Sequence, residues 1–382
     1  MGRCYPNRRQ SKGRIGILCC KAGEPFGKKV LSALEDIFNQ KDCLDEKPLI
    51  IPINETHFPN SEAKVEITKS VRGMDLYCIQ DVENREYEPA FVKSQVPLKE
   101  ICLPFELPDG INPNMHIEVR RPLSTDENFR ALKTALDAAK RSDAQYITAV
   151  LPSFPYARQD KSISREGITA SRIAQEIEDH GANRVLTLDV HNRAIAGFFR
   201  TAICENLHAS NVLIPYMKEN KFADEVVIAS PDEGGIARAN HYAKQLGLKL
   251  AMGYKRRDYT GKNGIEDFRI LGEVVQRRKT HEEQIETIQA LVSSNEPRDQ
   301  ILQKITEVLE IKAPGYNILF IDDIIDTAGT LVKAVKKAKE LGAKDVWFAC
   351  SLPLFNPPAE SRIDELYENK LLKGIIGTNA VY

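Results

Sequence analysis

The sequence predicts an α/β protein with two domains, each a mostly parallel β-sheet flanked by helices. Short apolar runs alternate with segments of helical periodicity, the pattern of parallel strands joined by crossover helices. Two such blocks follow one another, and in each an apolar strand ends in aspartate, at Asp189 and at Asp322–Asp323. A length of 382 residues predicts two to three domains, each able to bury its own core.

The individual elements follow from these patterns. Strands are predicted at the short apolar runs 15–19, 49–53, 76–80, 146–151, 184–190, 226–230, 249–253, 318–321 and 346–351. Helices are predicted at 28–39, 127–141, 170–179, 235–245 and 331–341. Two segments interrupt the alternation, 83–120 and 277–315, and both are predicted to be surface insertions. We expect an N-terminal domain over 1–207, which contains the first insertion, and a C-terminal domain over 208–382, which contains the second.

Composition narrows the class of protein. The formal net charge is −1 with 28% charged residues, so no basic field indicates binding to nucleic acid or to a membrane. No apolar run approaches the ~18 residues of a membrane-spanning helix. The eight cysteines form no C-x-x-C pair and no metal-binding spacing, and several lie inside apolar strands. Reduced core cysteines and a cytoplasmic location are therefore expected.

The most informative segment is 317–331, where a buried strand is followed by Asp322, Asp323 and Asp326, the turn 327–330, and a helix. Hydroxyls and free backbone N–H groups at a helix N-terminus suit a phosphate monoester. The paired aspartates would repel that phosphate, so they are expected to hold ribose hydroxyls or a cation. Simple helix capping is the alternative, although capping requires one acid and not three. The layout predicts a phosphoribosyl site.

Two further motifs follow strand ends, where an open α/β sheet binds its ligands. After the strand that ends at residue 151 come Arg158, Gln159 and Lys161, which are placed to bind a polyanion. A solvated basic loop is the alternative interpretation. His191 follows the strand that ends near Asp189, and its imidazole could bind a cation or accept a proton, or be only structural.

The second block contains two more motifs. Asp232 lies in the strand-to-helix turn 230–235, where it is either a ligand for a hard cation or an ordinary N-cap. Segment 254–264 is basic, contains glycine and follows a strand directly, but it lacks the G-x-x-x-x-G-K-[ST] order of a P-loop. A basic loop of this kind could close over a phosphoryl group and supply charge in the transition state.

Together these motifs resemble the ribose-phosphate pyrophosphokinase family, also called phosphoribosyl-pyrophosphate synthetases. The resemblance covers most of the chain in order, through 58–62, 65–67, 70–73, 126–129, 154–161, 164–170, 189–199, 230–235, 255–257 and 322–330. The last motif fits any phosphoribosyltransferase. The Tyr-Ala-Arg-Gln-Asp stretch at 156–160 and the Asp-x-His-x(5)-Gly-Phe-Phe stretch at 189–199 are specific to the synthetases.

The resemblance implies a fold, an activity and a set of site residues. It implies two phosphoribosyltransferase-type domains in a homo-oligomer, dimer-based or hexameric, with Mg²⁺ as cofactor and with ATP and ribose 5-phosphate as substrates. ATP would be bound by Phe58, Asn60, Glu62, Arg158 and Gln159, where Asn60 replaces a frequent Asp. Magnesium would be bound by His191 and Asp232, and Lys255 and Arg257 would be catalytic. Ribose 5-phosphate would be bound by Asp322, Asp323, Asp326, Thr327, Ala328, Gly329 and Thr330.

Several departures from the family pattern concern regulation. Both insertions are unusual in length, and the loop after Lys161 is one residue short. Arg193 and Ala196 replace the small polar residue and the Gln that help to bind an effector in the family. The chain also stops at Tyr382, where relatives continue with a further strand and helix. The substrate sites are expected to be intact, whereas phosphate activation and allosteric inhibition by ADP are expected to be lost.

The expected reaction is attack of the anomeric hydroxyl of ribose 5-phosphate on the β-phosphorus of Mg-ATP, which yields 5-phosphoribosyl 1-diphosphate and AMP. Catalysis would consist of positioning and charge neutralisation, with no general base assigned. Two alternatives stay open. A phosphoribosyltransferase would use the same ribose loop without need of Arg158, Gln159 or His191. A catalytically silent regulatory homologue would typically show a damaged catalytic loop or ribose loop, and neither is damaged here.

Overall fold

A computed structural model describes residues 13–40, 47–58, 62–84, 91–97, 116–220, 226–256, 267–272, 288–293, 297, 300, 301, 304 and 315–381, with the backbone alone for 91–97, 116–122, 252–256 and 267–272. The chain divides into two compact units. The first comprises Met1–Leu207 together with Asn379–Tyr382, and the second comprises His208–Thr378.

The first unit is built on a six-stranded sheet. Its strands are β1 (Ile15–Cys19), β2 (Leu49–Ile50), β5 (Asp75–Ile79), β8 (Tyr146–Leu151), β9 (Arg184–Leu188) and β10 (Ile203–Leu207). The strand order is β10-β9-β8-β5-β1-β2, and every neighbouring pair is parallel. Residues after Thr378 belong to this unit, where the Lys29 ammonium donates a hydrogen bond to the Asn379 carbonyl at 3.0 Å.

The second unit repeats this architecture. Its strands are β11 (Val226–Ser230), β12 (Lys249–Arg256), β13 (Asp267–Gly272), β14 (Asn317–Ile325), β15 (Val346–Pro353) and β16 (Gly374–Gly377). Their order is β13-β12-β11-β14-β15-β16. All neighbouring pairs are parallel except β12 with β13. The chain leaves β11 toward β12 on one side and returns to β14 on the other, so the strand order reverses between β11 and β14.

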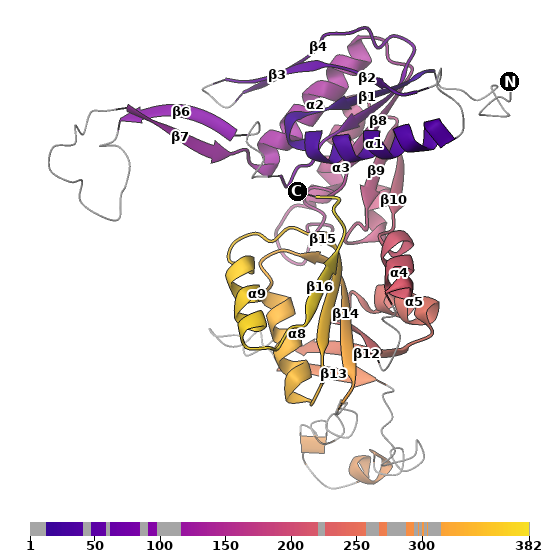
Figure 1. Ribbon diagram of the computed structural model, residues 1–382, viewed down its shortest axis with the longest axis vertical. Helices are drawn as coiled ribbons and strands as arrows, with labels where there is room; N and C mark the ends of the chain where they lie inside the picture. The colour runs from indigo at the N-terminus through magenta and orange to yellow at the C-terminus, as the bar shows by residue number, and fades with distance from the viewer. Residues whose placement is uncertain are drawn as a thin grey trace. The chain divides into compact units, whose positions relative to one another are not determined.

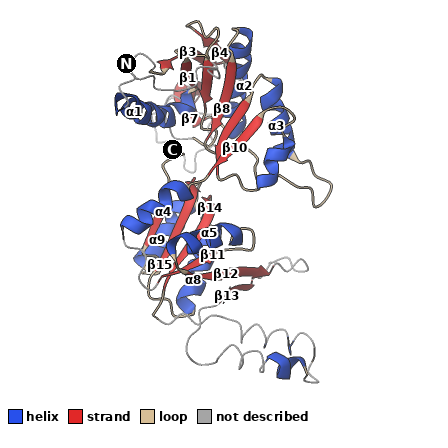
Figure 2. Ribbon diagram, turned by 90° about the vertical axis from the view of Figure 1, so that its right-hand side faces the viewer, coloured by secondary structure: helices blue, strands red, loops and turns tan. Residues whose placement is uncertain are grey.

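Helices lie on both faces of the sheets (Figure 2). The first unit has α1 (Glu24–Gln40), α2 (Thr125–Arg141) and α3 (Thr169–Asp179), with short 3₁₀ helices η2 (Lys21–Gly23) and η6 (Arg193–Phe198). In the second unit, α8 (Gly329–Glu340) and α9 (Ala359–Glu368) lie on one side of the sheet, and α4 (Ser210–Glu219) and α5 (Ile236–Leu246) lie on the other (Figure 1). A capping box begins α2: Ser124 Oγ accepts from the Glu127 N–H at 3.2 Å, and the Glu127 carboxylate accepts from the Ser124 N–H at 2.9 Å.

Two antiparallel hairpins accompany the first sheet. One pairs β3 (Ile53–His57) with β4 (Ala63–Ile67), and the other pairs β6 (Phe91–Pro97) with β7 (His116–Pro122). The second hairpin falls within the expected insertion 83–120 and continues two residues beyond it. Of the expected insertion 277–315, the structure describes a helical stretch over 288–292 and a few separate residues, and the remainder lies outside the described residues.

Each unit has its own apolar core. Strands covered on both faces are apolar along their length, as parallel sheets require, and all five residues of β11 are buried. Phe320 and Phe348 of the second core stack with ring centroids 6.0 Å apart. Cys20, Cys78 and Cys350 are buried and free. Burial raises the pKa of the Cys78 thiol to about 12, so this side chain remains a protonated apolar group.

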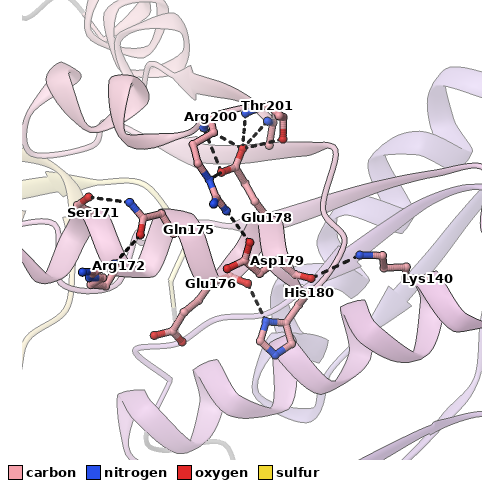
Figure 3. Close-up of polar contacts among 11 residues, drawn as sticks. Lys140, Ser171, Arg172, Gln175, Glu176, Glu178, Asp179, His180, Arg200 and Thr201 are labelled. Carbon is pink, nitrogen blue, oxygen red and sulfur yellow. Dashed lines mark hydrogen bonds and ion pairs between the residues drawn. The ribbon is translucent and has the colours of Figure 1, made fainter.

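A buried carboxylate fixes the segment that follows η6 (Figure 3). Glu178, in the last turn of α3, accepts hydrogen bonds from the backbone N–H groups of Arg200 at 3.0 Å and of Thr201 and Ala202 at 2.6 Å each. The Arg200 side chain adds a bond from Nε at 3.1 Å. Burial alone would raise the pKa of Glu178, but these donors outweigh it and lower the pKa to about 2.

The structure confirms the predicted fold class of two parallel sheets flanked by helices. The predicted strands 146–151 and 226–230 match β8 and β11 at both ends, whereas the predicted strand 49–53 is divided between β2 and β3. The prediction for 318–321 was short, because β14 continues to Ile325. In the described part of the chain, none of the helices combines the length and the apolar character needed to cross a membrane.

Candidate functional site

The second sheet reverses its strand order between β11 and β14, and open α/β sheets bind ligands beside such a reversal, at the carboxyl ends of the strands. Two expected site segments lie there. The turn after β11 carries Asp232, and the end of β14 carries Asp322 and Asp323. Topology therefore brings together carboxylates that are about ninety positions apart in the sequence.

Asp322 and Asp323 face an arginine from α5. Arg238 Nη1 lies 3.8 Å from Asp322 Oδ1, and Nη2 lies 3.5 Å from Asp323 Oδ2. Burial raises the pKa of Asp322 well above its usual range, and the negative charges of Asp323 and Asp232 act in the same direction. A ligand that brings hydroxyl donors or a cation to this pair would relieve the repulsion.

Asp232 is held by its own turn. Its Oδ1 accepts a hydrogen bond from the Gly235 N–H at 2.9 Å, and Ser230 Oγ donates to its backbone carbonyl at 2.6 Å. A Cβ atom at Gly235 would lie 2.6 Å from Ser230 Oγ, so a larger residue would displace this hydroxyl from its bond to Asp232. The N-cap residue of α5 is Gly235 and no side chain caps the helix, so Asp232 is not its N-cap; its carboxylate instead closes the turn that leads into α5. Oδ2 makes no hydrogen bond to the described residues and can accept a cation.

The turn after β14 begins α8 in an unusual way. Ala328 has a left-handed backbone conformation, with φ 58°, and no side chain caps the helix behind it. The first N–H groups of a helix have no partners within it, and the first turn of α8 contains no acidic residue. Gly329 and Thr330 therefore present an open, positively polarised helix end, which suits an anion.

Residues from the segment after β15 support this turn. Asn356 Nδ2 donates to Asp326 Oδ1 at 2.8 Å, and Arg362 Nη1 donates to the Thr327 carbonyl at 2.8 Å. Both donors come from about thirty positions farther along the chain, at the start of α9. The turn is therefore held at a fixed place relative to the helix that follows the next strand.

In the first unit, two expected site loops meet at the ends of neighbouring strands. Arg158 and Gln159 follow β8, and His191 follows β9; the side chains of all three are exposed. Asn192 Nδ2 donates to the Asp160 carboxylate, which ties the loop after β9 to the loop after β8. Because β8 and β9 are parallel neighbours, both loops lie at the carboxyl end of the same sheet.

Both loops contain residues with strained backbone. Tyr156 and Asp189 have φ values of 58° and 40°, in the left-handed region. Tyr156 is fixed by its hydroxyl, which donates to Asp126 Oδ1 at 2.6 Å. That hydrogen bond, with burial acting in the same direction, raises the pKa of Tyr156 to about 12. The loop after β8 is thereby anchored to α2.

The expected adenine-binding residues lie at the end of the β3–β4 hairpin. The Phe58 N–H donates to the Glu62 carbonyl at 2.8 Å, and the Phe58 side chain is 42% exposed. Next to it, His57 Nε2 lies 2.7 Å from Glu55 Oε1, and this carboxylate also accepts from the Lys21 N–H at 2.8 Å. The Phe58 ring is therefore exposed at a hairpin end that neighbouring hydrogen bonds hold in place. Asn60 lies outside the described residues.

The expected catalytic residues are placed only in part. β12 continues through Arg256, where Lys255 pairs with Phe268 of β13. The expectation that Lys255 lies in the loop after a strand was therefore wrong: the apolar run ends at Gly253, but the antiparallel pairing with β13 extends the strand. Arg257 lies outside the described residues.

Comparisons with known proteins place this fold in a family. Residues 15–181 match a family model described as the N-terminal domain of ribose phosphate pyrophosphokinase, and residues 214–372 match the phosphoribosyl transferase domain. Ribose-phosphate pyrophosphokinase 1 of Listeria monocytogenes is 31% identical over 318 residues, which cover 83% of this chain and 74% of that protein. The chain belongs to the ribose-phosphate pyrophosphokinase family.

Other members of the ribose-phosphate pyrophosphokinase family are similarly close. The Campylobacter jejuni protein is 32% identical over 321 residues, which cover 83% of this chain and 77% of the relative. The Chlorobaculum tepidum protein is 36% identical over 247 residues, 64% of each chain. A crystal structure of phosphoribosylpyrophosphate synthetase from Mycobacterium smegmatis covers 96% of this chain and 89% of its own, with a TM-score of 0.66 and 24% identity, and it supports the fold.

Three side chains at the candidate site were not predicted from the sequence: Arg238, Asn356 and Arg362. Each reaches the aspartate loop from another element. Arg238 lies six positions after Asp232, inside the predicted helix 235–245, and no role was predicted for it. Within the chain itself, local patterns contained no signal for Asn356 or Arg362, because both contacts depend on how the segment after β15 folds back.

Proposed function

We propose that this protein is a ribose-phosphate diphosphokinase, which transfers the β,γ-diphosphoryl group of Mg-ATP to the anomeric hydroxyl of ribose 5-phosphate. The products are 5-phosphoribosyl 1-diphosphate and AMP. One observation carries the proposal: Asp322 and Asp323, near the end of β14, and the uncapped N-terminus of α8 are joined by a short turn, beside the reversal of strand order. A sugar phosphate offers hydroxyls to the first and an anion to the second.

The ribose 5-phosphate loop divides these tasks. Asp322 and Asp323 accept the ribose hydroxyls, and Asp326 extends this acidic side of the site. The turn of Thr327, Ala328, Gly329 and Thr330 donates hydroxyl and backbone N–H hydrogen bonds to the 5-phosphate. The Asn356 bond to Asp326 fixes this segment to the residues that follow β15.

ATP is assigned to the first unit. The exposed ring of Phe58 is suited to stacking on the adenine, with Asn60 and Glu62 beside it. Arg158 and Gln159 contact the phosphates and the nucleotide from the loop after β8. The synthetase relatives are consistent with this assignment, since both phosphoribosyltransferase-type units are matched in this chain.

Magnesium fits the donors that are present. Hard cations of this size are usually bound by one or two carboxylates together with substrate phosphates and water, and Asp232 uses only Oδ1 in its turn, while Oδ2 makes no hydrogen bond to the described residues. His191, in the loop after β9 of the first unit, is also proposed as a magnesium-binding residue. When bound, the ion offsets the charge of the phosphate oxygens. Lys255 and Arg257 stabilise the negative charge that develops on the transferred group.

The test is direct. Purified protein is incubated with ATP, Mg²⁺ and ribose 5-phosphate, and AMP formation is followed together with the ³¹P signals of a diphosphate on C1. A phosphoribosyltransferase would release no AMP from ATP, and a silent homologue would leave both substrates unchanged. Either result would overturn the proposed function. A dimer-based homo-oligomer is also proposed, and light scattering measures it.

A further inference from the structure

Arg362 occupies an unusual position for a cation. It lies in the first turn of α9, and its Nη1 donates to the Thr327 carbonyl at 2.8 Å. A Cβ atom built on Gly329 would lie 3.7 Å from the same nitrogen. The guanidinium therefore stands over the turn of the ribose 5-phosphate loop, beside the first residue of α8.

Two positive features converge at this place. The N-terminus of α8 carries the partial positive charge of the helix dipole, and no side chain caps it. A fixed guanidinium beside that end raises the electrostatic potential further. Without an anion this arrangement is unfavourable, since a cation is stabilised at the C-terminal end of a helix and not at the N-terminal end.

No protein anion offsets the charge among the described residues, because no carboxylate there lies within ion-pair distance of Arg362. Neighbouring cations differ in this respect. In the same helix pair, the exposed Lys336 of α8 pairs with Glu365 of α9 at 3.1 Å. Arg238, at the other end of the loop, faces Asp322 and Asp323.

We propose that Arg362 binds the 5-phosphate of ribose 5-phosphate, as a binding residue in addition to the Thr327–Thr330 turn. The inference rests on the proposed function and assigns to that site a cationic side chain from a different element. A guanidinium has five N–H donors in a planar fork. One of them is used by the Thr327 carbonyl, so the turn itself orients the group while the remaining donors serve the phosphate.

The contact also explains how the subsite would select a phosphorylated sugar. Backbone N–H groups and threonine hydroxyls accept many oxygen ligands, whereas a guanidinium together with a helix N-terminus favours a doubly charged oxyanion. Free ribose would retain its contacts with Asp322 and Asp323 and gain nothing from Arg362. Arg362 therefore determines preference for the phosphate group and not for the sugar.

Calorimetric titration of the full chain with ribose 5-phosphate tests the proposal. Arg362→Gln keeps an N–H donor for the Thr327 carbonyl but removes the charge, and we expect its affinity to fall about tenfold or more. Arg362→Lys keeps the charge without the fork, and a loss of about threefold is expected. The matched control is Lys336→Gln, which removes a cation from the same helix pair away from the turn, and its affinity should stay within about twofold.

Binding of ribose 5-phosphate by Arg362→Gln with the wild-type affinity would overturn the inference, as would equal losses in the Gln and Lys variants. Should Arg362→Gln fail to fold, the ³¹P shift of ribose 5-phosphate bound to Arg362→Lys decides, since an unchanged shift excludes contact. Inorganic phosphate is titrated in parallel, and its affinity should fall in Arg362→Gln as well. Because titration requires no turnover, absence of AMP in the activity assay overturns the proposed function alone.

Discussion

Glu178 is expected to contribute a large part of the stability of the first unit through a charge that interacts with backbone N–H groups. In Glu178→Gln the new amide oxygen can replace Oε1, which accepts from Thr201 and Ala202. The amide nitrogen then replaces Oε2 and faces two donors, the backbone N–H and the Nε of Arg200. The charge and the hydrogen bond from Arg200 Nε are lost, whereas the Arg200 N–H, which also donates to Oε1 at 3.0 Å, keeps that acceptor.

The size of the effect follows from the pKa. Lowering of the Glu178 pKa from 4.5 to about 2 corresponds to about 3 kcal/mol of folding free energy at neutral pH. Solvent near the end of α3 screens part of this interaction, so a measured loss of about 2 kcal/mol is expected for Glu178→Gln. The neighbouring Asp179 is the control: it pairs with the same Arg200, but 64% of its side chain is exposed. Asp179→Asn should cost less than about 0.5 kcal/mol.

The assay is urea denaturation at several pH values, followed by far-UV circular dichroism. The single tryptophan, Trp347, lies in the second unit, and its fluorescence serves as a reference that Glu178→Gln should affect less. Because the folded-state pKa is lowered, the stabilisation is complete above pH 4.5 and decreases as the pH falls toward 2. The difference between wild type and variant should therefore shrink by about 1 kcal/mol between pH 6 and pH 3.5. A difference that does not vary with pH, or equal losses in both variants, would refute the reasoning.

Four further predictions concern the proposed reaction. Asp323→Ala should reduce turnover by about a hundredfold or more with the fold retained, and ribose 5-phosphate binding that survives both this change and Thr330→Ala in calorimetry contradicts the assignment. His191→Ala should raise the magnesium concentration for half-maximal rate about tenfold while ribose 5-phosphate affinity stays the same; an unchanged magnesium curve would make His191 structural. Lys255→Met should lower kcat about a hundredfold with the KM for ATP within about threefold, and a change in KM alone would assign Lys255 to ground-state binding. Catalysis should proceed without added phosphate because Arg193 replaces a small polar residue, and ADP inhibition that saturating ATP does not relieve would show that an effector site is retained.

Much of the fold could be predicted because a buried parallel strand appears in the sequence as a continuous apolar run. β8 and β11 are continuous apolar runs, and their ends coincide with the predicted ends. β4 was missed, since its burial alternates and only Val65 is buried. β10 was missed for a related reason: it is an edge strand in which Ile203 and Leu207 are exposed. Strands with few buried residues have few apolar residues in sequence, so their pattern is too weak to predict a strand.

The candidate site shows the same limit. The aspartate loop could be recognised because strand, acidic pair, turn and helix occupy consecutive positions. The side chains that hold it could not be recognised, because Arg238, Asn356 and Arg362 reach it through the packing of α5 and α9. The contacts of Asn356 and Arg362 depend on the register between β14 and β15, in which Ile325 pairs with Pro353. No local sequence pattern predicts this register.

Tyr156, Asp189 and Ala328 have left-handed backbone conformations, and each lies in a loop assigned to a ligand. Such conformations cost side-chain-bearing residues about 1–2 kcal/mol, which glycine avoids. A redesign guided by thermostability alone would therefore place glycine at all three positions. Glycine would relieve the backbone strain, but it would also make the three loops more flexible. Loops that change conformation would align the proposed substrates less accurately. Tyr156, Asp189 and Ala328 are therefore the positions at which a stabilising glycine substitution is most obvious and at which it should be avoided.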